Sequence, residues 1–328
     1  MHKSLRHFAL GACVLALGLA TTGAALAQAF PNRPVKIITP FPAGQGPDVL
    51  VRLVADKLGA EWGQAVVVEN KPGASGFIAF QAVKAAPADG YTLVQMDSFH
   101  VGTQQHLFKK LPYDAFKDFD PVTPLVRNDF FVVVPADSKF RTMGDLIAAA
   151  KAKPDAVSYG SWAVASPGHL AGLLLESATG TRMTHVPFKE ISQLYQSVAT
   201  GEVDWAVGSA VSTSALYKGG RLRYLAVAGD KRTPGFMDVP TVAEAGGSAA
   251  MQVGGWNGLL VPHGTPKDVT EKINAAVQKA MTSPDIKERL ALFTYENYTM
   301  STLEMARLMA SEPKKWGELI KAADIKLD

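Results

Sequence analysis

Short apolar runs rich in β-branched residues alternate with amphipathic segments along most of the chain. Residues 35–38 and 66–68 are two such runs. Between them Leu50, Val54 and Leu58 recur every fourth residue, which is the spacing of one buried face of a helix. Because strand and helix keep alternating, we predict an α/β fold with mainly parallel sheets that carry helices on both faces.

The length of the chain and two breaks in its pattern predict a division into two lobes. The 328 residues exceed the usual size of one domain. We place crossings between the lobes near residues 124–128 and 253–256, so that residues 28–126 and 254–328 form the first lobe and residues 127–253 the second. If the first lobe takes back the C-terminal helices, a binding site lies in the cleft between the lobes.

The first residues have the pattern of a cleaved export signal. A basic head with Lys3 and Arg6 precedes an uncharged apolar run over residues 8–19, and Ala25-Leu26-Ala27 forms a small-x-small cleavage site. We therefore predict a signal peptide over residues 1–27 and a periplasmic location. An uncleaved membrane anchor is the alternative, but the small residues that end the apolar run are untypical of a membrane span.

Charge, cysteine content and motif content argue against several classes of function. The formal net charge is +3, and without Lys3 and Arg6 the mature chain has no basic stripe for nucleic acid. Cys13 is the only cysteine and leaves with the signal. The histidines lack the spacing of a metal site, and no Gly-x-Ser-x-Gly elbow of a serine esterase occurs. We expect no catalytic residue, no metal site and no cofactor.

Two glycine-rich loops follow the first two predicted strands. Residues 40–48 read Pro-Phe-Pro-Ala-Gly-Gln-Gly-Pro-Asp, and residues 70–76 read Asn-Lys-Pro-Gly-Ala-Ser-Gly. The carboxyl ends of parallel strands meet at one edge of a sheet, where helix N-termini present unpaired amides. Because glycine lets the backbone approach an anion closely, the two loops together favour an anion-binding site over simple turns.

A dinucleotide-binding enzyme is an alternative explanation of the first loop. Gly44-x-Gly46 follows a strand and opens a helix, and Glu69 ends the next strand, which is most of a Rossmann fingerprint. However, Val49 occupies the third glycine position, and Pro47 has no backbone N–H to donate to a pyrophosphate. Export would also remove the chain from the main nicotinamide pool. We therefore rank an exported NAD-dependent enzyme below a solute-binding protein.

A series of sequence blocks along the mature chain follows the order of one known family. The blocks are Pro40-Phe41-Pro42-Ala43-Gly44, Val66-Val67-Val68-Glu69-Asn70-Lys71-Pro72-Gly73-Ala74-Ser75-Gly76, Ala88-Asp89-Gly90-Tyr91-Thr92-Leu93, Leu111-Pro112-Tyr113-Asp114, Ser166-Pro167-Gly168-His169-Leu170-Ala171-Gly172, Val186-Pro187-Phe188-Lys189 and Asp238-Val239-Pro240-Thr241-Val242-Ala243-Glu244-Ala245-Gly246. With these blocks the chain resembles the periplasmic substrate-binding proteins of tripartite tricarboxylate transporters, often called the Bug family.

The resemblance implies a two-lobed venus-flytrap protein that performs no chemistry on its solute. Such a protein closes on a small carboxylate and delivers it to a transporter with two integral membrane subunits. We expect it to act as a monomer, without a nucleic-acid partner.

By position, the resemblance also implies two groups of ligand contacts. The first-lobe group comprises Phe41, Pro42, Ala43, Gly44, Gly73, Ala74, Ser75 and Gly76, with Phe77 and Ser98 beside it and Asp97 and Phe99 bordering it. The second-lobe group comprises Trp162, Ser166, His169, Pro187, Lys189, Gly208 and Ser209.

Aromatic residues near these positions lead to a hypothesis about the ligand. Trp162 stands in a stretch that is usually small and polar in the family, and Phe41, Phe77 and Phe188 are expected nearby. Aromatic faces beside carboxylate-binding amides suggest an aromatic mono- or dicarboxylate, such as a phthalate-type acid. In the alternative, Trp162 packs against its own lobe and the ligand is an aliphatic di- or tricarboxylate or an amino acid. Both alternatives stay open.

Three further positions bear on ligand identity. Gln45 stands where the family usually has a second glycine, and Glu190-Ile191 replaces a common Gly-Gly, so both loops are expected to be stiffer or differently aimed. We expect Lys189 to face the pocket. Asp48 is predicted to be a helix N-cap, although in the cleft it would favour an ammonium group.

Overall fold

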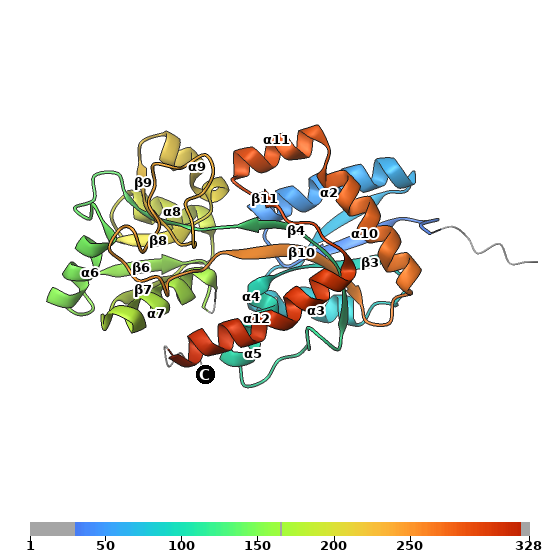
Figure 1. Ribbon diagram of the computed structural model, residues 1–328, viewed down its shortest axis with the longest axis horizontal. Coiled ribbons are helices and arrows are strands. Elements are labelled where there is room, and N and C mark those ends of the chain that lie inside the picture. Colours follow the sequence, from blue (N-terminus) through green and yellow to red (C-terminus); the bar gives the residue numbers. More distant parts are fainter. Residues whose placement is uncertain (1–29, 165, 323–328) are drawn as a thin grey trace, which may run out of the picture.

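The computed structural model describes residues 30–164 and 166–322 and shows two α/β lobes side by side (Figure 1). Each lobe is built around one sheet with helices packed on it. This arrangement confirms the predicted two-lobed α/β fold. The predicted signal peptide, residues 1–27, lies outside the described residues, and the lobe boundaries at residues 126/127 and 253/254 stay a prediction. Within the described part of the chain, no helix is both long and apolar enough to cross a membrane.

The strands divide between the two sheets as follows. The first sheet has the strand order β11-β4-β10-β3-β1-β2, with β1 (Val35–Thr39), β2 (Val66–Asn70), β3 (Thr92–Asp97), β4 (Phe119–Asn128), β10 (Gly255–Pro262) and β11 (Glu296–Asn297). The second sheet has the order β7-β6-β8-β5-β9, with β5 (Phe131–Pro135), β6 (Ser158–Ser161), β7 (Thr184–Pro187), β8 (Trp205–Gly208) and β9 (Leu222–Val227).

Both sheets are mixed, so the predicted parallel arrangement holds for only part of each. β1 is parallel to β2 and β3, and β6 is parallel to β7 and β8. β10 is antiparallel to β3 and β4, and β5 is antiparallel to β8 and β9. The reason lies in the two crossings: β4 leads the chain out of the first lobe and β10 leads it back, with Gly255 opposite Asn128.

Helices cover both faces of each sheet. The helices of the first lobe are α2 (Gly46–Trp62), α3 (Phe77–Lys84), α4 (Ser98–Gly102), α5 (Gln104–Leu107), α10 (Lys267–Met281), α11 (Pro284–Phe293) and α12 (Thr302–Ala322), with a short 3₁₀ turn η1 (Ala74–Gly76) before α3. The helices of the second lobe are α6 (Met143–Ala152), α7 (Pro167–Thr179), α8 (Ile191–Ala199) and α9 (Ala210–Lys218).

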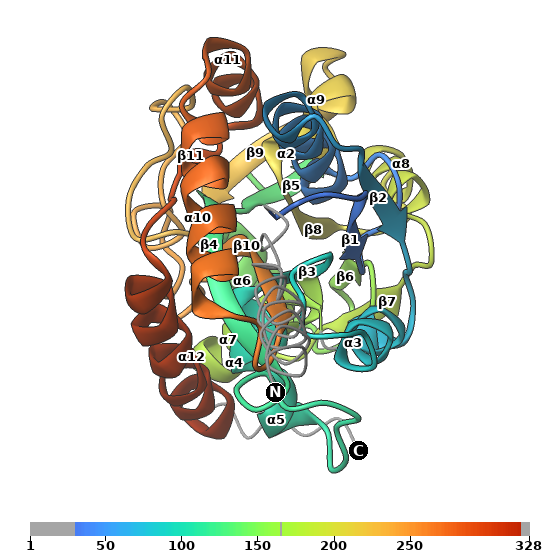
Figure 2. The same ribbon diagram turned by 90° about the vertical axis from the view of Figure 1, so that its right-hand side faces the viewer.

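The alternation of side chains along each strand explains this layering. In the first lobe, Ile37 packs with α2 and α10, whereas its neighbour Ile38 packs with α3 and α12, so helices lie on both sides of the sheet (Figure 2). In the second lobe, Val132 faces α6 and α7, and Phe131 faces α8 and α9. The result in each lobe is a sheet buried on both faces, with its loops free to form a cleft.

Helix α12 connects the cores of the two lobes. It packs against α4 and β4 of the first lobe and against α7 of the second lobe. Trp316 and Ile320 lie in the same buried cluster as Leu174 of α7. The C-terminal helix therefore supports the region where the chain crosses between the lobes.

Candidate ligand-binding cleft

A cavity of about 540 Å³ lies between the two lobes. Its volume falls in the range of roughly 300–1,000 Å³ that is typical of small-molecule sites. From the first lobe and the strands between the lobes it is lined by Pro40, Phe41, Pro42, Gln45, Pro47, Pro72, Gly73, Ala74, Ser75, Gly76, Asp97, Phe99, His100, Gln104, Asn128, Phe130, Gly255, Trp256, Asn257 and Tyr295. From the second lobe it is lined by Trp162, Ala163, Val164, Ser166, Pro167, Lys189, Glu190, Ile191, Tyr195, Ser209 and Ser212.

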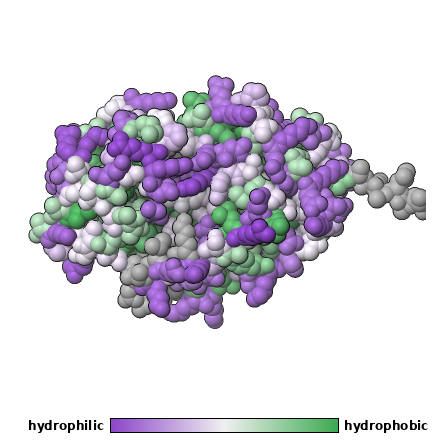
Figure 3. Space-filling view, in the orientation of Figure 1, coloured by the Kyte–Doolittle hydropathy of each residue, from purple (hydrophilic) through white to green (hydrophobic). Residues whose placement is uncertain are grey.

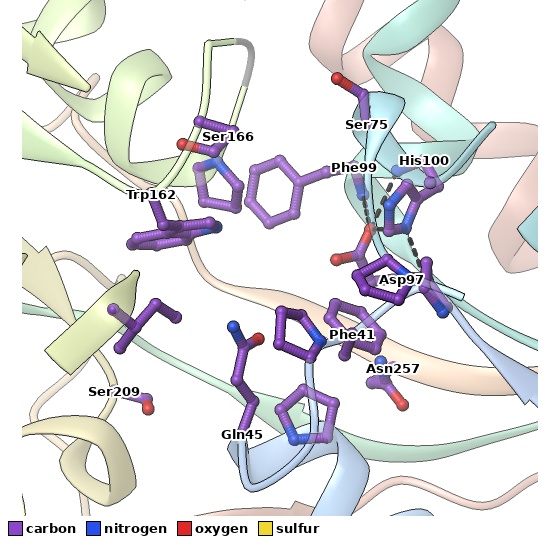
Figure 4. Close-up of a pocket in the computed structure, with 18 of the residues that line it drawn as sticks. Phe41, Gln45, Ser75, Asp97, Phe99, His100, Trp162, Ser166, Ser209 and Asn257 are labelled. Carbon is purple, nitrogen blue, oxygen red and sulfur yellow. Dashed lines mark hydrogen bonds and ion pairs between the residues drawn. The ribbon is translucent and has the colours of Figure 1, made fainter. Parts of the chain in front are cut away.

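Many of the predicted ligand-contact residues meet in this cavity. Those that line it are Phe41, Pro42, Gly73, Ala74, Ser75, Gly76, Trp162, Ser166, Lys189 and Ser209. They come from both lobes, which places the two glycine-rich loops opposite the second-lobe loops, as Figure 4 shows for Phe41 and Ser75 on one side and Trp162 and Ser209 on the other.

The structure places the other predicted first-lobe residues outside the cavity lining. Ala43 and Gly44 lie on the exposed side of their loop. Phe77 packs into its own lobe, with its ring 5.2 Å from that of Phe108. Ser98 is buried against the backbone of Gly255, where a Cβ would lie 2.2 Å from the Ser98 hydroxyl oxygen. Packing within the first lobe therefore occupies the side chains of Phe77 and Ser98.

The second-lobe residues His169, Pro187 and Gly208 also lie outside the lining. His169 is buried in α7, where its ring stacks on that of His185. Pro187 is exposed at the end of β7. Gly208 is packed against Tyr195, because a Cβ at this position would lie 2.8 Å from the Tyr195 hydroxyl oxygen.

The first glycine-rich loop is held by a buried carboxylate, that of Asp48. Its oxygens accept hydrogen bonds from the Gly44 amide at 2.8 Å, from Asn70 Nδ2 at 2.7 Å and from Arg52 Nε at 3.1 Å. Asn70 Nδ2 also donates to the carbonyl of Phe41 at 2.9 Å. Burial alone would raise the pKa of Asp48, but these donors outweigh burial and lower it below its ordinary value.

This arrangement corrects the predicted role of Asp48. The N-cap of α2 is Gln45, and Asp48 lies one turn further, inside the helix. Its side chain reaches back to the Gly44 amide instead of capping the helix. Since the carboxylate is only 2% exposed and engaged by three side-chain or backbone partners, it ties the two glycine-rich loops together.

The second glycine-rich loop has an unusual backbone that faces the cavity. Gly73, Ala74, Ser75 and Gly76 all have positive φ angles, of 107°, 45°, 53° and 90°. Backbone amides in turn conformations can form a concave anion-binding site. Gln104 fixes the loop by donating from Nε2 to the Ser75 carbonyl at 2.8 Å. Ala74 and Ser75 hold a left-handed conformation that is strained for residues other than glycine, as residues at ligand clamps often do.

Aromatic rings line the opposite end of the cavity. The rings of Trp162 and Phe130 have their centroids 5.6 Å apart, so the indole packs on its own lobe while it also lines the cavity. Figure 4 shows Trp162 on the second-lobe side with Phe99 of the first lobe facing it. A flat apolar group between these rings would contact both lobes at once.

The cavity lining contains few charges. Among the described lining residues, Lys189 is the one lysine or arginine, and Asp97 and Glu190 are the two residues with a carboxylate. Asp97 caps α4 by accepting from the amides of Phe99 and His100 at 3.0 and 2.9 Å, and its Oδ1 lies 2.7 Å from Nδ1 of His100. An anionic ligand in this cavity would therefore depend mainly on neutral donors and backbone amides.

Sequence reasoning missed several lining residues from the region between the lobes, among them Asn128, Phe130, Asn257 and Tyr295. Asn128 and Phe130 lie where the chain leaves the first lobe, Asn257 lies on β10, and Tyr295 precedes β11. An asparagine inside a predicted buried strand was the one available signal, because asparagine is depleted in strands. Within the described residues, no three histidine, cysteine, aspartate or glutamate side chains are arranged to hold a metal ion.

A family model and a curated relative each match most of the chain. Residues 50–325 match the family model described as the tripartite tricarboxylate transporter family receptor. A UPF0065 protein encoded in the tcbD-tcbE intergenic region of Pseudomonas sp. (strain P51) is 33% identical over 315 residues, which cover 96% of this chain and 94% of the relative.

Two solved structures of ligand-bound proteins have the same fold. A protein of R. palustris with adipate superimposes with a TM-score of 0.84 at 31% identity, covering 90% of this chain and 99% of that chain. MatC from Rhodopseudomonas palustris with bound malate superimposes with a TM-score of 0.81 at 28% identity, covering 89% of this chain and 100% of that chain.

Proposed function

The chain belongs to the tripartite tricarboxylate transporter receptor family, and we propose that it captures a small carboxylate in the cleft between its lobes and delivers it to a membrane transporter. It is a solute-binding receptor and not an enzyme. The receptors of this family work in the periplasm, and the signal peptide proposed over residues 1–27 would export the chain to that compartment.

The backbone of residues 73–76 is the observation that carries this proposal. Four consecutive residues with positive φ angles line the cavity, so we expect the amides of Ala74 and Ser75 to bind an anionic oxygen. The hydrogen bonds from Gln104 and from the Asp48 network hold both glycine-rich loops in place before any ligand arrives. Such preorganisation reduces the entropy that binding would otherwise cost.

For the ligand itself, we propose an aromatic mono- or dicarboxylate, such as a phthalate-type acid. Trp162 and Phe130 of the second lobe and Phe41 and Phe99 of the first lobe support this choice, because their rings line one cavity. The alternative is an aliphatic di- or tricarboxylate, which the adipate and malate of the two similar structures favour. An amino acid gains no support from Asp48, whose carboxylate is engaged by Arg52 and Asn70.

In this mechanism the ligand shifts a balance between an open and a closed form. Because the amides of residues 74–75 belong to the first lobe and Trp162 to the second, a ligand that touches both stabilises the closed form selectively. We propose that the closed form is a monomer that docks on two integral membrane subunits of the transporter. On the face in Figure 3, hydrophilic residues spread over both lobes, which suits reversible docking.

Thermal unfolding of the purified protein with candidate ligands tests the proposal. The panel contains benzoate, phthalate, adipate, malate, citrate, amino acids and NAD. A ligand that binds only the folded state raises the unfolding temperature. A shift with benzoate or phthalate alone supports an aromatic ligand, and a shift with adipate, malate or citrate alone replaces it by the aliphatic alternative. A shift with NAD alone would overturn the proposed function.

A further inference from the structure

Asn257 lies on the floor of the cleft, on one of the two strands that cross between the lobes. The residue is only 3% exposed, yet it lines the cavity. Figure 4 shows it beside Phe41, below the level of the second-lobe side chains. Neither the sequence blocks nor the two glycine-rich loops include this residue.

A chain of hydrogen bonds fixes which way the Asn257 amide points. Gln95 Nε2 donates to the carbonyl of Pro47 at 3.0 Å and to Asn257 Oδ1 at 2.6 Å. Thr39 Oγ1 donates to Gln95 Oε1 at 2.6 Å. Because the Pro47 carbonyl can only accept, Gln95 must present its amino group to both partners. Asn257 therefore turns its oxygen towards Gln95 and its nitrogen away from it.

The amide nitrogen of Asn257 is a buried donor without a hydrogen-bond partner among the described residues. Burying a donor that no acceptor satisfies costs free energy, and an acceptor supplied by a ligand would remove that cost. Resting on the proposed function, we propose that Asn257 Nδ2 binds a carboxylate oxygen of the ligand on the cleft floor. This subsite adds a side-chain donor to the backbone amides of residues 74–75.

The chemistry of this subsite restricts what it accepts. An amide nitrogen donates and does not accept, so an acceptor oxygen fits and an ammonium group does not. The subsite also lies on β10, which enters the first sheet from the crossing between the lobes. A ligand that bound this subsite and the second lobe together would contact both lobes and a strand that crosses between them, which would couple binding to closure.

The other role for this amide is structural, with its N–H groups directed at the neighbouring Phe41 ring. Weak N–H contacts of this kind to aromatic rings occur in proteins. The two roles differ in their consequences. A structural contact affects the stability of the protein alone, whereas a ligand subsite also affects the affinity for carboxylates.

Isothermal titration calorimetry of Asn257 variants tests the subsite. The probes are benzoate, phthalate, adipate and malate, and the acid that binds the wild type most tightly is carried forward. Asn257→Asp keeps the shape of the side chain and the bond from Gln95, but it replaces the donor by an anionic acceptor. We expect its affinity for that acid to fall about 10- to 100-fold. Asn257→Leu removes the donor without adding charge and is expected to weaken binding about 10-fold.

A matched control separates loss of a ligand contact from loss of a buried polar group. Thr233 also carries a buried hydroxyl without a partner among the described residues, and it lies outside the cavity lining. We expect Thr233→Val to bind like the wild type. Wild-type affinity in folded Asn257→Asp and Asn257→Leu would overturn the subsite and leave the proposed function intact. A wild type that binds neither these four acids nor citrate would instead overturn both.

Discussion

The imidazole rings of His169 and His185 are stacked face to face, with centroids 4.0 Å apart and planes inclined by 10°. The pair adjoins the loop that carries Trp162: His185 Nε2 lies 2.7 Å from Ser161 Oγ, and the His169 amide donates to Ser166 Oγ, the N-cap of α7. Burial, together with the neighbouring His185, lowers the pKa of His169 to about 4. Burial also lowers the pKa of His185. Both rings are therefore neutral at neutral pH.

The histidine pair predicts a loss of stability in mild acid. Because the folded pKa of His169 is about 4 and its ordinary value is 6.5, the unfolded chain binds more protons between these pH values. The contribution of the neutral His169 ring to the free energy of unfolding is fully present above pH 6.5 and is lost as the pH falls towards 4. We expect the wild type to lose about 3 kcal/mol more than His169→Gln over this interval, at roughly 1.4 kcal/mol per pKa unit. Urea unfolding at several pH values measures it, and parallel pH profiles would contradict the prediction.

Replacing Trp162 should separate aromatic from aliphatic ligands. Trp162→Ala removes a ring that lines the cavity and packs on Phe130. For an aromatic acid such as benzoate we expect an affinity loss of about 10-fold or more, because ring stacking adds to the lost apolar burial. Trp162→Phe keeps an aromatic face and should retain most of the affinity. Calorimetric titration with benzoate and with adipate is the measurement, and an equal loss for both acids would argue against an aromatic ligand.

The Asp48 network should contribute measurably to stability. Asp48→Asn removes the charge that pairs with Arg52 and places an amide group where Asn70 donates. We expect the free energy of unfolding at pH 7 to fall by about 2 kcal/mol, the scale of hydrogen bonds to a charged group. Since the folded pKa of Asp48 is lowered, this contribution is present above the ordinary value of 3.8 and is lost as the pH falls below it. Asp56→Asn, at an exposed position of the same helix, is the control and should change little.

Relieving the strained loop before α3 should raise stability and lower ligand affinity. Ala74 has a φ of 45°, which glycine adopts without strain. We expect Ala74→Gly to raise the free energy of unfolding by up to about 1 kcal/mol. It should also weaken carboxylate binding a few-fold, because the amides lose preorganisation. Asp155→Gly relieves a similar conformation, with a φ of 62°, outside the cavity lining. Urea unfolding and titration of the same samples measure both effects. An Ala74→Gly variant with unchanged free energy of unfolding and unchanged affinity would contradict the prediction.

Much of the fold follows from residue periodicity. The predicted runs 35–38 and 66–68 lie in strands β1 and β2, and the helical spacing of Leu50, Val54 and Leu58 lies in helix α2. Periodicity does not state which strands become neighbours, so the antiparallel pairing of β10 and β5 could not be predicted from it. Helix α9 was not predicted, because few of its residues are apolar and buried and its pattern is weak.

The site could be predicted from sequence where glycines in a loop indicate an unusual backbone conformation. The glycines of residues 73–76 indicated an anion site, and these residues line the cavity. Asn257 and Phe130 could not be found in this way, because their exposure to the cavity depends on how two distant strands pair at the crossing. The role of Asp48 depends likewise on Asn70, which only the folded chain brings within 2.7 Å.

The two charges at the second-lobe side of the cavity should decide between mono- and dianionic ligands. Lys189 and Glu190 are adjacent and exposed, both line the cavity, and neither forms an ion pair with another described residue. A ligand with a second carboxylate brings a second negative charge near Glu190. Glu190 therefore repels a dianionic ligand more strongly than a monoanionic one. We expect Glu190→Gln to raise the affinity for adipate up to about 5-fold, the scale of exposed charge pairs, and that for hexanoate less. Lys189→Met should weaken the binding of both acids and reduce the salt dependence of binding.

Hexanoate and adipate have the same chain length and differ by one carboxylate, so the ratio of their affinities isolates the effect of the second charge. Titrations at low and high salt measure that ratio, and a ratio that stays the same in Glu190→Gln would show that Glu190 does not select against the second charge.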